Sequence, residues 1–441
     1  MPQRRVAIQT LGCRLNQADS ALIAADFTAH GYAVVPWGEA AEVAVVNSCA
    51  VTGVATQKSR HAVSFARRLN PGAFVVLCGC AAMDEKALDC PPELQPDLVV
   101  PNPKPPSIAA LLPEDPRHCA DGVCRHCGST PLADGFVIAG TGEYPLHNRA
   151  YIKIQEGCNF RCTYCIVPQT RGEPCSRDLD DILREAEALL QRGHRELVLT
   201  GVNIATYHNR GADLTALIGR LLRLSPHFRV RLGSTEPGPV LDRLIELMKC
   251  ERRLCRFLHL PVQYGADAIL ERMGRHYSCR KYADTVMRAV EQIPGVCIGT
   301  DLMVGFPGET DELFMECRRF VEEMPFGLMH IFSYSPRPGT PAALWPRPPA
   351  PAVEQREKAM LALARAKADA FAASQVGTEV SVLIEKDNCG WSDNYLKVRL
   401  EPQPPLAPNT LCECRLEAAD GDRRMSGCLL SRHANGASEQ P

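Results

Sequence analysis

The chain lacks three features that would assign it to a membrane, secreted or strongly basic class of protein. No apolar run approaches the roughly 20 residues that a membrane-spanning helix needs. Met1 to Arg5 lead directly into the strand-like segment Val6–Ile8, without the pattern of a signal peptide. The formal net charge is only −2 at pH 7, so no global basic field indicates a nucleic-acid partner. These absences favour a cytoplasmic globular protein, and 441 residues predict about two to four domains.

Cysteine is the residue type in excess, with 21 in the chain. Many cysteines in a small secreted chain would indicate disulfides, but this chain is large enough to form a core without them. We therefore expect reduced cysteines that serve as metal-cluster ligands and core residues.

Three of these cysteines, Cys158, Cys162 and Cys165, lie in one short loop with three and two intervening residues. Thiolates suit zinc or an iron–sulfur cluster. Structural zinc requires four protein ligands, and this loop supplies three. A 4Fe–4S cluster held by three thiolates leaves one iron open for another ligand. The loop therefore favours such a cluster, with a zinc loop or a coincidental spacing as the alternative.

The first hundred residues alternate strand and helix signals, which predicts a parallel sheet with helices on its faces. The strands are Val6–Leu11, Val43–Asn47 and Phe74–Leu77; the helices are Ala18–His30, Gln57–Leu69 and Asp84–Asp89. Each strand is followed by a cysteine, and ligands bind beyond the carboxyl ends of such strands. Cys13, Cys49 and Cys80 thus predict a second three-thiolate metal site. Cys80 is preferred to Cys78, since Cys78 continues the strand.

The centre of the chain, from 147 to 350, repeats strand–helix units and predicts a partial (β/α)6 barrel with its site at the carboxyl ends of the strands. The strands are Tyr151–Ile154, Glu196–Thr200, Arg229–Leu232, Phe257–Leu260, Val296–Met303 and Met329–Tyr334. Polar residues and a glycine near these strand ends form a candidate nest for an amino acid and a ribose: Thr200, Gly201, Asn203, Ser234, Glu236, Gln263 and Asp301.

The remaining segments are connecting or terminal. Prolines mark 106–146 as a linker, in which Cys119, Cys124 and Cys127 form either a zinc knot or a loop with incidental cysteines. Short alternating strands after Val376 predict a small β-barrel. The predicted domains are 1–105, the linker 106–146, the barrel 147–350, a linker helix 351–375, the terminal β-barrel 376–432 and a disordered tail 433–441.

The two cysteine trios and the terminal β-barrel together resemble the radical S-adenosylmethionine (SAM) methylthiotransferases. The resemblance implies a flavodoxin-like α/β domain with an auxiliary 4Fe–4S cluster on the first trio. It implies a radical SAM barrel with a second 4Fe–4S cluster on the later trio, and a terminal RNA-binding module called TRAM. The strand-end residues would then contact SAM, and no catalytic residue is assigned beyond the cluster ligands.

Short motifs favour one branch of this family, since the segments Thr10–Gln17, Asn47–Thr52 and Arg229–Pro237 are similar to the MtaB-type enzymes. These enzymes place a methylthio group on carbon 2 of N6-threonylcarbamoyladenosine beside the tRNA anticodon. The barrel cluster would generate a 5′-deoxyadenosyl radical from SAM, and the auxiliary cluster would carry the sulfur. Alternatives are the isopentenyladenosine-directed enzymes and, in another class, a zinc-stabilised non-catalytic RNA-binding protein.

The resemblance also implies partners. The tRNA anticodon loop is the expected substrate. An electron donor such as flavodoxin or ferredoxin is also expected. The protein itself is expected to be a monomer. Candidate RNA contacts are basic residues that could equally be solvated: Lys58, Arg60, Arg275, Lys397 and Arg399.

Overall fold

The structure is a computed structural model that describes residues 3–83, 91–102, 107–113, 124–125, 136–138 and 148–432. Contacts divide the chain into two compact units. The first comprises Met1–Ala188, Thr200–Arg210 and Ser335–Ala343, and the second Leu189–Leu199, Gly211–Tyr334 and Leu344–Pro441. These units do not follow the predicted domain ranges, because the first joins the N-terminal sheet to the cysteine loop at 158–165.

Several predicted features lie outside the described residues. They are the helix Asp84–Asp89, the tail 433–441 and the thiols of Cys119, Cys124 and Cys127.

The N-terminal part of the first unit is a parallel sheet with strand order β2-β1-β3-β4-β5-β6. Its strands are β1 (Arg5–Thr10), β2 (Ala33–Val35), β3 (Val43–Ser48), β4 (Phe74–Gly79), β5 (Leu98–Val100) and β6 (Cys124–Arg125). The order of the first five strands is the flavodoxin-like 2-1-3-4-5, so this part of the predicted fold class is confirmed.

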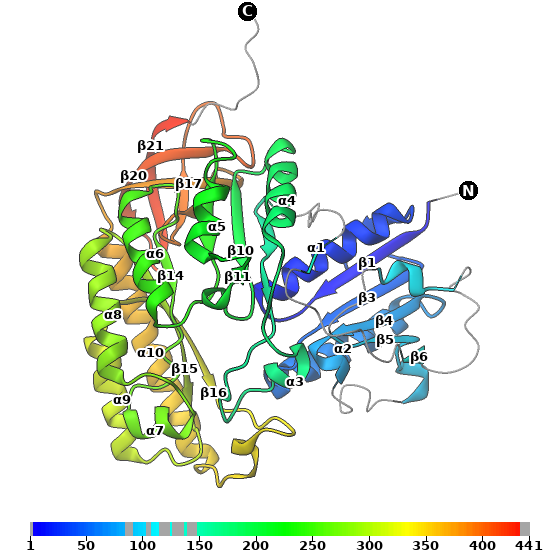
Figure 1. Ribbon diagram of the computed structural model, residues 1–441, viewed down its shortest axis with the longest axis horizontal. Coiled ribbons are helices and arrows are strands. Elements are labelled where there is room, and N and C mark those ends of the chain that lie inside the picture. Colours follow the sequence, from blue (N-terminus) through cyan, green and yellow to red (C-terminus); the bar gives the residue numbers. More distant parts are fainter. Residues whose placement is uncertain are drawn as a thin grey trace, which may run out of the picture. The chain divides into compact units, whose positions relative to one another are not determined.

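Helices α1 (Arg14–Ala29) and α2 (Gly53–Leu69) cover opposite faces of this sheet (Figure 1). Phe27 of α1 lies in one apolar cluster and Val63 of α2 in another. Both helices begin four residues before the predicted starts at Ala18 and Gln57, because apolar periodicity does not mark the residue at which a helix begins. Cys13 is the N-cap residue of α1, and the side chain of Thr52 caps α2.

The central part follows the predicted alternation. Its longer strands are β7 (Ala150–Lys153), β10 (Glu196–Thr200), β13 (Arg229–Leu232), β14 (Phe257–His259), β15 (Cys297–Val304) and β16 (Phe326–Ser333). Its helices are α3 (Val167–Arg171), α4 (Leu179–Gln191), α5 (Leu214–Leu221), α6 (Pro239–Cys250), α7 (Asp267–Arg272), α8 (Cys279–Gln292) and α9 (Asp311–Glu323). β10 pairs in parallel with β13, and β14, β15 and β16 form a second parallel sheet.

Short elements occupy the connections between these strands and helices. The short strands are β8 (Gln155–Glu156), β9 (Cys175–Ser176), β11 (His208–Asn209) and β12 (Ala212–Asp213). The 3-10 turns are η1 (Cys80–Met83), η3 (Pro92–Leu94), η4 (Ala109–Leu111), η6 (Ile204–Thr206) and η7 (Pro341–Leu344). Among the described residues, no helix is both long enough and apolar enough to span a membrane.

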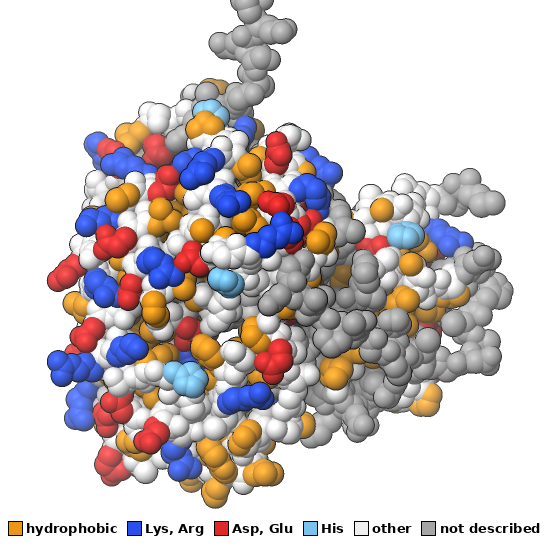
Figure 2. Space-filling model, in the orientation of Figure 1, with side chains coloured by type: hydrophobic (Ala, Val, Ile, Leu, Met, Phe, Trp, Pro, Cys, Tyr) orange, Lys and Arg blue, Asp and Glu red, His pale blue; other side chains and the backbone are white. Residues whose placement is uncertain are grey.

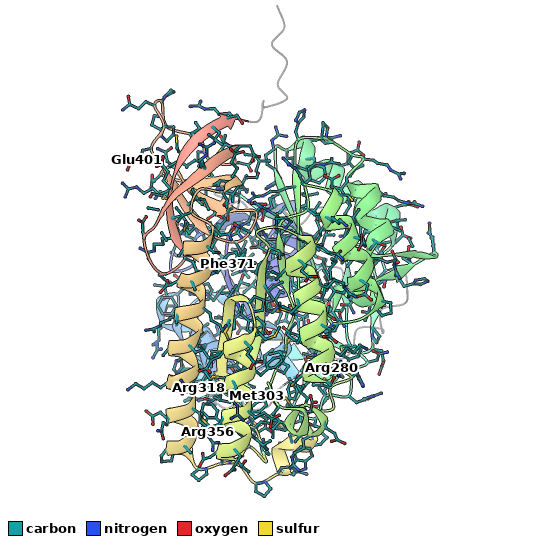
Figure 3. The ribbon with its side chains drawn as sticks, turned by 90° about the vertical axis from the view of Figure 1, so that its left-hand side faces the viewer. Arg280, Met303, Arg318, Arg356, Phe371 and Glu401 are labelled. Atoms are coloured by element: carbon teal, nitrogen blue, oxygen red, sulfur yellow. The ribbon has the colours of Figure 1, made fainter. Side chains whose placement is uncertain are left out.

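The predicted linker helix, α10 (Ala350–Ser374), is part of the folded second unit (Figure 3). Near its start Arg356 binds Glu309 at 2.7 Å and Asp311 at 2.6 Å. Near its end Phe371 packs against both the cluster of Phe257, Cys297 and Leu328 and the core of the terminal β-barrel. The helix therefore joins two parts of the second unit through buried contacts.

The terminal module is a closed five-stranded barrel with strand order β17-β18-β19-β21-β20. The strands are β17 (Glu379–Lys386), β18 (Cys389–Ser392), β19 (Lys397–Leu400), β20 (Leu411–Ala419) and β21 (Arg424–Arg432). The small β-barrel is thus confirmed. Antiparallel pairing of β18 with β17 and β19, and pairing of β21 with β19 and β20, completes the barrel.

Candidate metal and cofactor centres

The first cysteine trio lies at the carboxyl ends of adjacent strands. Cys13 is exposed at the start of α1, whereas Cys49 after β3 and Cys80 after β4 are each 5% exposed. Gly12, with φ of +93°, lies so close to Cys49 that an added Cβ would be 2.7 Å from its sulfur. Burial, with the neighbouring thiols of Cys13 and Cys80, raises the pKa of Cys49 to about 12. The three cysteines thus follow the ends of neighbouring strands of one sheet, as expected for shared metal ligands.

Cys80 has two donors directed at its sulfur, whereas Cys78 is part of the core. Nε of Arg171 donates to Cys80 Sγ at 3.3 Å, and Nδ2 of Asn102 donates to it at 3.5 Å. Cys78 is wholly buried in the apolar cluster that includes Phe27. These environments favour Cys80 as the third ligand, because donors to sulfur stabilise a thiolate.

Arg171 is the centre of a buried polar network. Its Nη1 donates to Oε1 of Glu156 at 2.7 Å, and its Nη2 donates to Asn16 at 2.5 Å and Asp19 at 3.2 Å. The side chains of Arg171, Glu156 and Asp19 are at most 3% exposed. Burial alone would lower the pKa of Arg171, but Cys80 and the two carboxylates raise it well above its ordinary value. The guanidinium is therefore a fixed cation.

Lys153 completes the network. Its Nζ lies 3.1 Å from Asp19 and also contacts Glu156. Two cations and two carboxylates balance one another inside the first unit, so no net charge is buried. The network links α1 to the segment that precedes Cys158, which explains why contacts group that segment with the N-terminal sheet.

The second trio lies in a loop whose start is fixed by a backbone hydrogen bond to Gly172. Cys158 N donates to Gly172 O at 3.0 Å, and Cys165 N donates to Cys162 O at 3.1 Å. Gly157, with φ of +71°, lies so close to Glu173 that an added Cβ would be 2.0 Å from its carbonyl oxygen. Only glycine fits there, so the position of Cys158 depends on this close backbone approach.

Among the described residues, one group of His, Cys, Asp and Glu side chains has three ligand atoms within 4.8 Å of one another, and it consists of His259, Asp301 and His330. Structural zinc takes four protein ligands, whereas each cysteine trio supplies three thiols, which suits a 4Fe–4S cluster with one open iron.

Three predicted strand-end residues lie in the first unit beside the cysteine loop. Thr200 is 2% exposed, and Gly201 lies so close to Gln155 that an added Cβ would be 2.9 Å from its side chain. Asn203 N donates to Oε1 of Gln155 at 3.0 Å, and Asn203 Oδ1 accepts from Ala205 N. Nδ2 of Asn203 is buried and has no hydrogen-bond partner among the described residues. An amide donor is thus left for a ligand.

The other predicted strand-end residues lie in the second unit. Oγ of Ser234 lies 2.8 Å from Nδ1 of His259, whose Nε2 lies 3.3 Å from Oδ1 of Asp301. Gln263 adopts a φ of +67°, and its buried Oε1 has no partner in the described part of the chain. His330 pairs with Asp301 in the register of β15 and β16. This set can hydrogen-bond a polar ligand, and its imidazoles and carboxylate could also bind a divalent cation.

Glu236 and Arg275 form an ion pair. The side chain of Arg275 is 5% exposed, and its guanidinium contacts Glu236 and the Tyr277 hydroxyl. Burial raises the pKa of Glu236 even though Arg275 opposes the shift. These contacts hold Arg275, which the sequence also offers as a candidate RNA contact, against Glu236 and Tyr277.

Two family models match the chain. The radical SAM superfamily model matches residues 152–321, and the model described as uncharacterized protein family UPF0004 matches residues 5–98. A protein of Aquifex aeolicus called threonylcarbamoyladenosine tRNA methylthiotransferase MtaB is 34% identical over 90% of this chain and 97% of its own length. The chain belongs to the radical SAM methylthiotransferase family.

Other methylthiotransferase relatives are almost as similar. The MtaB of Bacillus subtilis is 33% identical over 89% of each chain. A tRNA-2-methylthio-N(6)-dimethylallyladenosine synthase of Cereibacter sphaeroides is 33% identical over 96% of this chain and 98% of its own. Similarity over the whole length therefore shows the family, and identity alone does not separate its branches.

The residues present fit the groups that a radical SAM enzyme uses. The three thiols of the 158–165 loop leave room for a fourth ligand on a 4Fe–4S cluster. The backbone amide of Phe160 donates to Cys158 Sγ at 3.4 Å, which stabilises a thiolate. The buried Nδ2 of Asn203 is a donor available to SAM in the same unit.

The remaining candidate RNA contacts of this methylthiotransferase lie on the surface. Lys58 of α2 and Lys397 and Arg399 of β19 are exposed, and Arg60 is half-buried. Acidic and basic side chains are interspersed over the face shown in Figure 2. Any RNA contact on that face would therefore depend on individual basic side chains and not on a continuous basic patch.

Sequence reasoning did not assign Arg171 or His330. Arg171 lies 91 residues from Cys80, so no local spacing connects them. His330 lies within β16 and not at its end, so the strand-end rule did not identify it, whereas His259 ends β14 and fits that rule.

Proposed function

We propose that this methylthiotransferase modifies tRNA, placing a methylthio group on carbon 2 of N6-threonylcarbamoyladenosine beside the anticodon. The methylthiotransferase activity rests on the near full-length similarity to relatives such as the MtaB of Aquifex aeolicus. The observation that carries the choice of branch is the MtaB-like sequence of the segments Thr10–Gln17, Asn47–Thr52 and Arg229–Pro237.

Cys158, Cys162 and Cys165 would hold the radical SAM cluster. When bound, that cluster and SAM supply a 5′-deoxyadenosyl radical, which is needed because the C2–H bond of adenine is unactivated. Thr200, Gly201 and Asn203 would contact SAM within the first unit. Ser234, Glu236, Gln263 and Asp301 of the second unit are proposed to bind SAM or the modified base.

Cys13, Cys49 and Cys80 would hold an auxiliary 4Fe–4S cluster that carries the sulfur to be transferred. Their position beyond parallel strands, with Cys13 at a helix N-terminus, suits an anionic cluster. Iron analysis of anaerobically purified protein tests this assignment. Two clusters give about eight irons per chain, and about four irons would mean that one of the two trios binds no cluster.

The partners follow from the same assignment. The anticodon loop of tRNA is the proposed substrate, since single-stranded loop bases can be splayed out and read on their edges. Lys58, Arg60, Lys397 and Arg399 are the proposed phosphate contacts. We further propose a cytoplasmic monomer reduced by flavodoxin or ferredoxin.

The substrate is tested by deleting the gene and digesting total tRNA for mass spectrometry. Loss of 2-methylthio-threonylcarbamoyladenosine, with accumulation of its unthiolated precursor, is the expected result. Loss of the dimethylallyl analogue instead would favour the other branch, to which the Cereibacter sphaeroides relative belongs by name.

A further inference from the structure

Arg171 connects the two cysteine trios within the first unit. Its Nε donates to Cys80 of the first trio at 3.3 Å, while its Nη1 donates to Glu156, two residues before Cys158 of the second. The side chain is 3% exposed, so water does not compete for these contacts.

We propose that Arg171 is a positioning residue that holds the Cys80 thiolate by hydrogen bonding and raises the reduction potential of the auxiliary cluster. The inference rests on the proposed function, since it requires a cluster on Cys13, Cys49 and Cys80.

Hydrogen bonds to the ligand sulfurs and the local charge set the potential of an iron–sulfur cluster. Reduction adds negative charge to the cluster and its thiolates. A donor at 3.3 Å from a ligand sulfur stabilises the reduced form more than the oxidised form, so the potential rises. Arg171 also keeps its proton throughout, because a guanidinium does not deprotonate in proteins.

A purely structural role does not require the contact to sulfur. The carboxylates of Glu156 and Asp19 already accept hydrogen bonds from the two terminal nitrogens of Arg171 and form ion pairs with Lys153. The Nε–H group is directed at Cys80 in addition. A lysine at this position would keep the charge but could not contact the sulfur and both carboxylates at once, because it lacks the planar fork.

The test uses a background in which Cys158, Cys162 and Cys165 are all replaced by Ala, so that the auxiliary cluster is the cluster observed. Arg171→Met removes the donor and the charge at similar side-chain length. We expect about four irons to remain and the cluster to become at least tenfold harder to reduce, which is about 59 mV for one electron. A redox titration followed by electron paramagnetic resonance measures the shift.

Lys153→Met is the matched control, because Lys153 belongs to the same network and has no contact with Cys80 among the hydrogen bonds and ion pairs of the structure. The reduction potential of the auxiliary cluster should shift much less in Lys153→Met than in Arg171→Met. Equal shifts would overturn the inference, since they would reflect the network charge and not the donor to sulfur. An unchanged potential in Arg171→Met would also overturn it.

Two further variants keep the test decisive if Arg171→Met fails to fold. Arg171→Lys keeps the charge and should lower the potential by a smaller amount. Asn102→Leu removes the second donor to Cys80, at 3.5 Å, and should shift the potential in the same direction. An unshifted potential in both would overturn the inference. Absence of iron from the parent background would instead overturn the auxiliary cluster itself.

Discussion

Nε of Arg231 lies 2.7 Å from Oε1 of Glu196, and neither side chain is exposed to solvent. Arg229 shares the same carboxylate at 2.6 Å. Two arginines on one strand thus meet one glutamate on the neighbouring strand, and the remaining guanidinium donors must be satisfied elsewhere.

The terminal β-barrel satisfies them. Arg229 donates to the carbonyl oxygens of Ser381 and Trp391, each at 2.7 Å, and Arg231 donates to that of Ser392 at 2.9 Å. The terminal β-barrel is therefore part of the folded second unit. Truncation before Val376 would remove the carbonyl acceptors of Arg229 and Arg231 and leave only Glu196 to pair with them, so it is unsuitable for testing an RNA-binding role.

Replacing Glu196 with Ala should destabilise the protein by about 3–5 kcal/mol, because it leaves two buried arginines without their counter-charge. Urea denaturation followed by tryptophan fluorescence measures the loss. The control is Glu379→Ala, which breaks an exposed pair with Arg415 and should cost about 0–1 kcal/mol. Similar midpoints for the two variants would contradict the buried-pair interpretation.

Gly157→Ala should remove the radical SAM cluster, because its methyl group would overlap the carbonyl of Glu173 and displace Cys158. Gly172→Ala is the matched control. Gly172 has a similar φ of +74° with nothing within 4 Å, so that variant bears only the conformational cost of about 1–2 kcal/mol. Iron analysis should show loss of about half the metal in the first variant only. Equal iron in both would show that the loop can shift without losing the cluster.

The two trios should be functionally separable. Replacing Cys13, Cys49 and Cys80 with Ala should leave about half the iron and continued release of 5′-deoxyadenosine, yet no methylthio group on tRNA. Replacing Cys158, Cys162 and Cys165 should abolish every SAM-derived radical product.

Cys78→Ala is the control for these triple variants, and it should keep all the iron because Cys78 packs in the sheet core. Iron loss in this control would mean that Cys78, not Cys80, is the third ligand. Loss of deoxyadenosine in a folded variant of the first trio would show that the clusters depend on each other.

Reversing the charge of Lys397 and Arg399 should weaken tRNA binding without changing stability, since both side chains are exposed. Each lost phosphate contact should flatten the log–log salt dependence of binding by about 0.7–0.9. Lys386→Glu serves as the control, because Lys386 is on β17 of the same barrel and its side chain is 84% exposed. Unchanged affinity in the double variant would exclude this part of β19 from the RNA surface.

Local pattern was enough to predict the elements that carry the chemistry. The alternation of strands and helices placed Cys13, Cys49 and Cys80 at one sheet edge, since parallel strands end together. The spacing of the second trio is likewise local. The starts of α1 and α2 were predicted four residues late, because apolar periodicity does not report capping.

Only the tertiary structure decided which distant side chains meet. Arg171 and Cys80 are 91 residues apart, and Arg231 meets the backbone of Ser392 across 161 residues. Such contacts depend on how whole elements pack, and a buried charge can be satisfied by any partner that packing brings near. The sequence therefore determined the types of ligand and their order, whereas packing determined the donors and counter-charges that surround them.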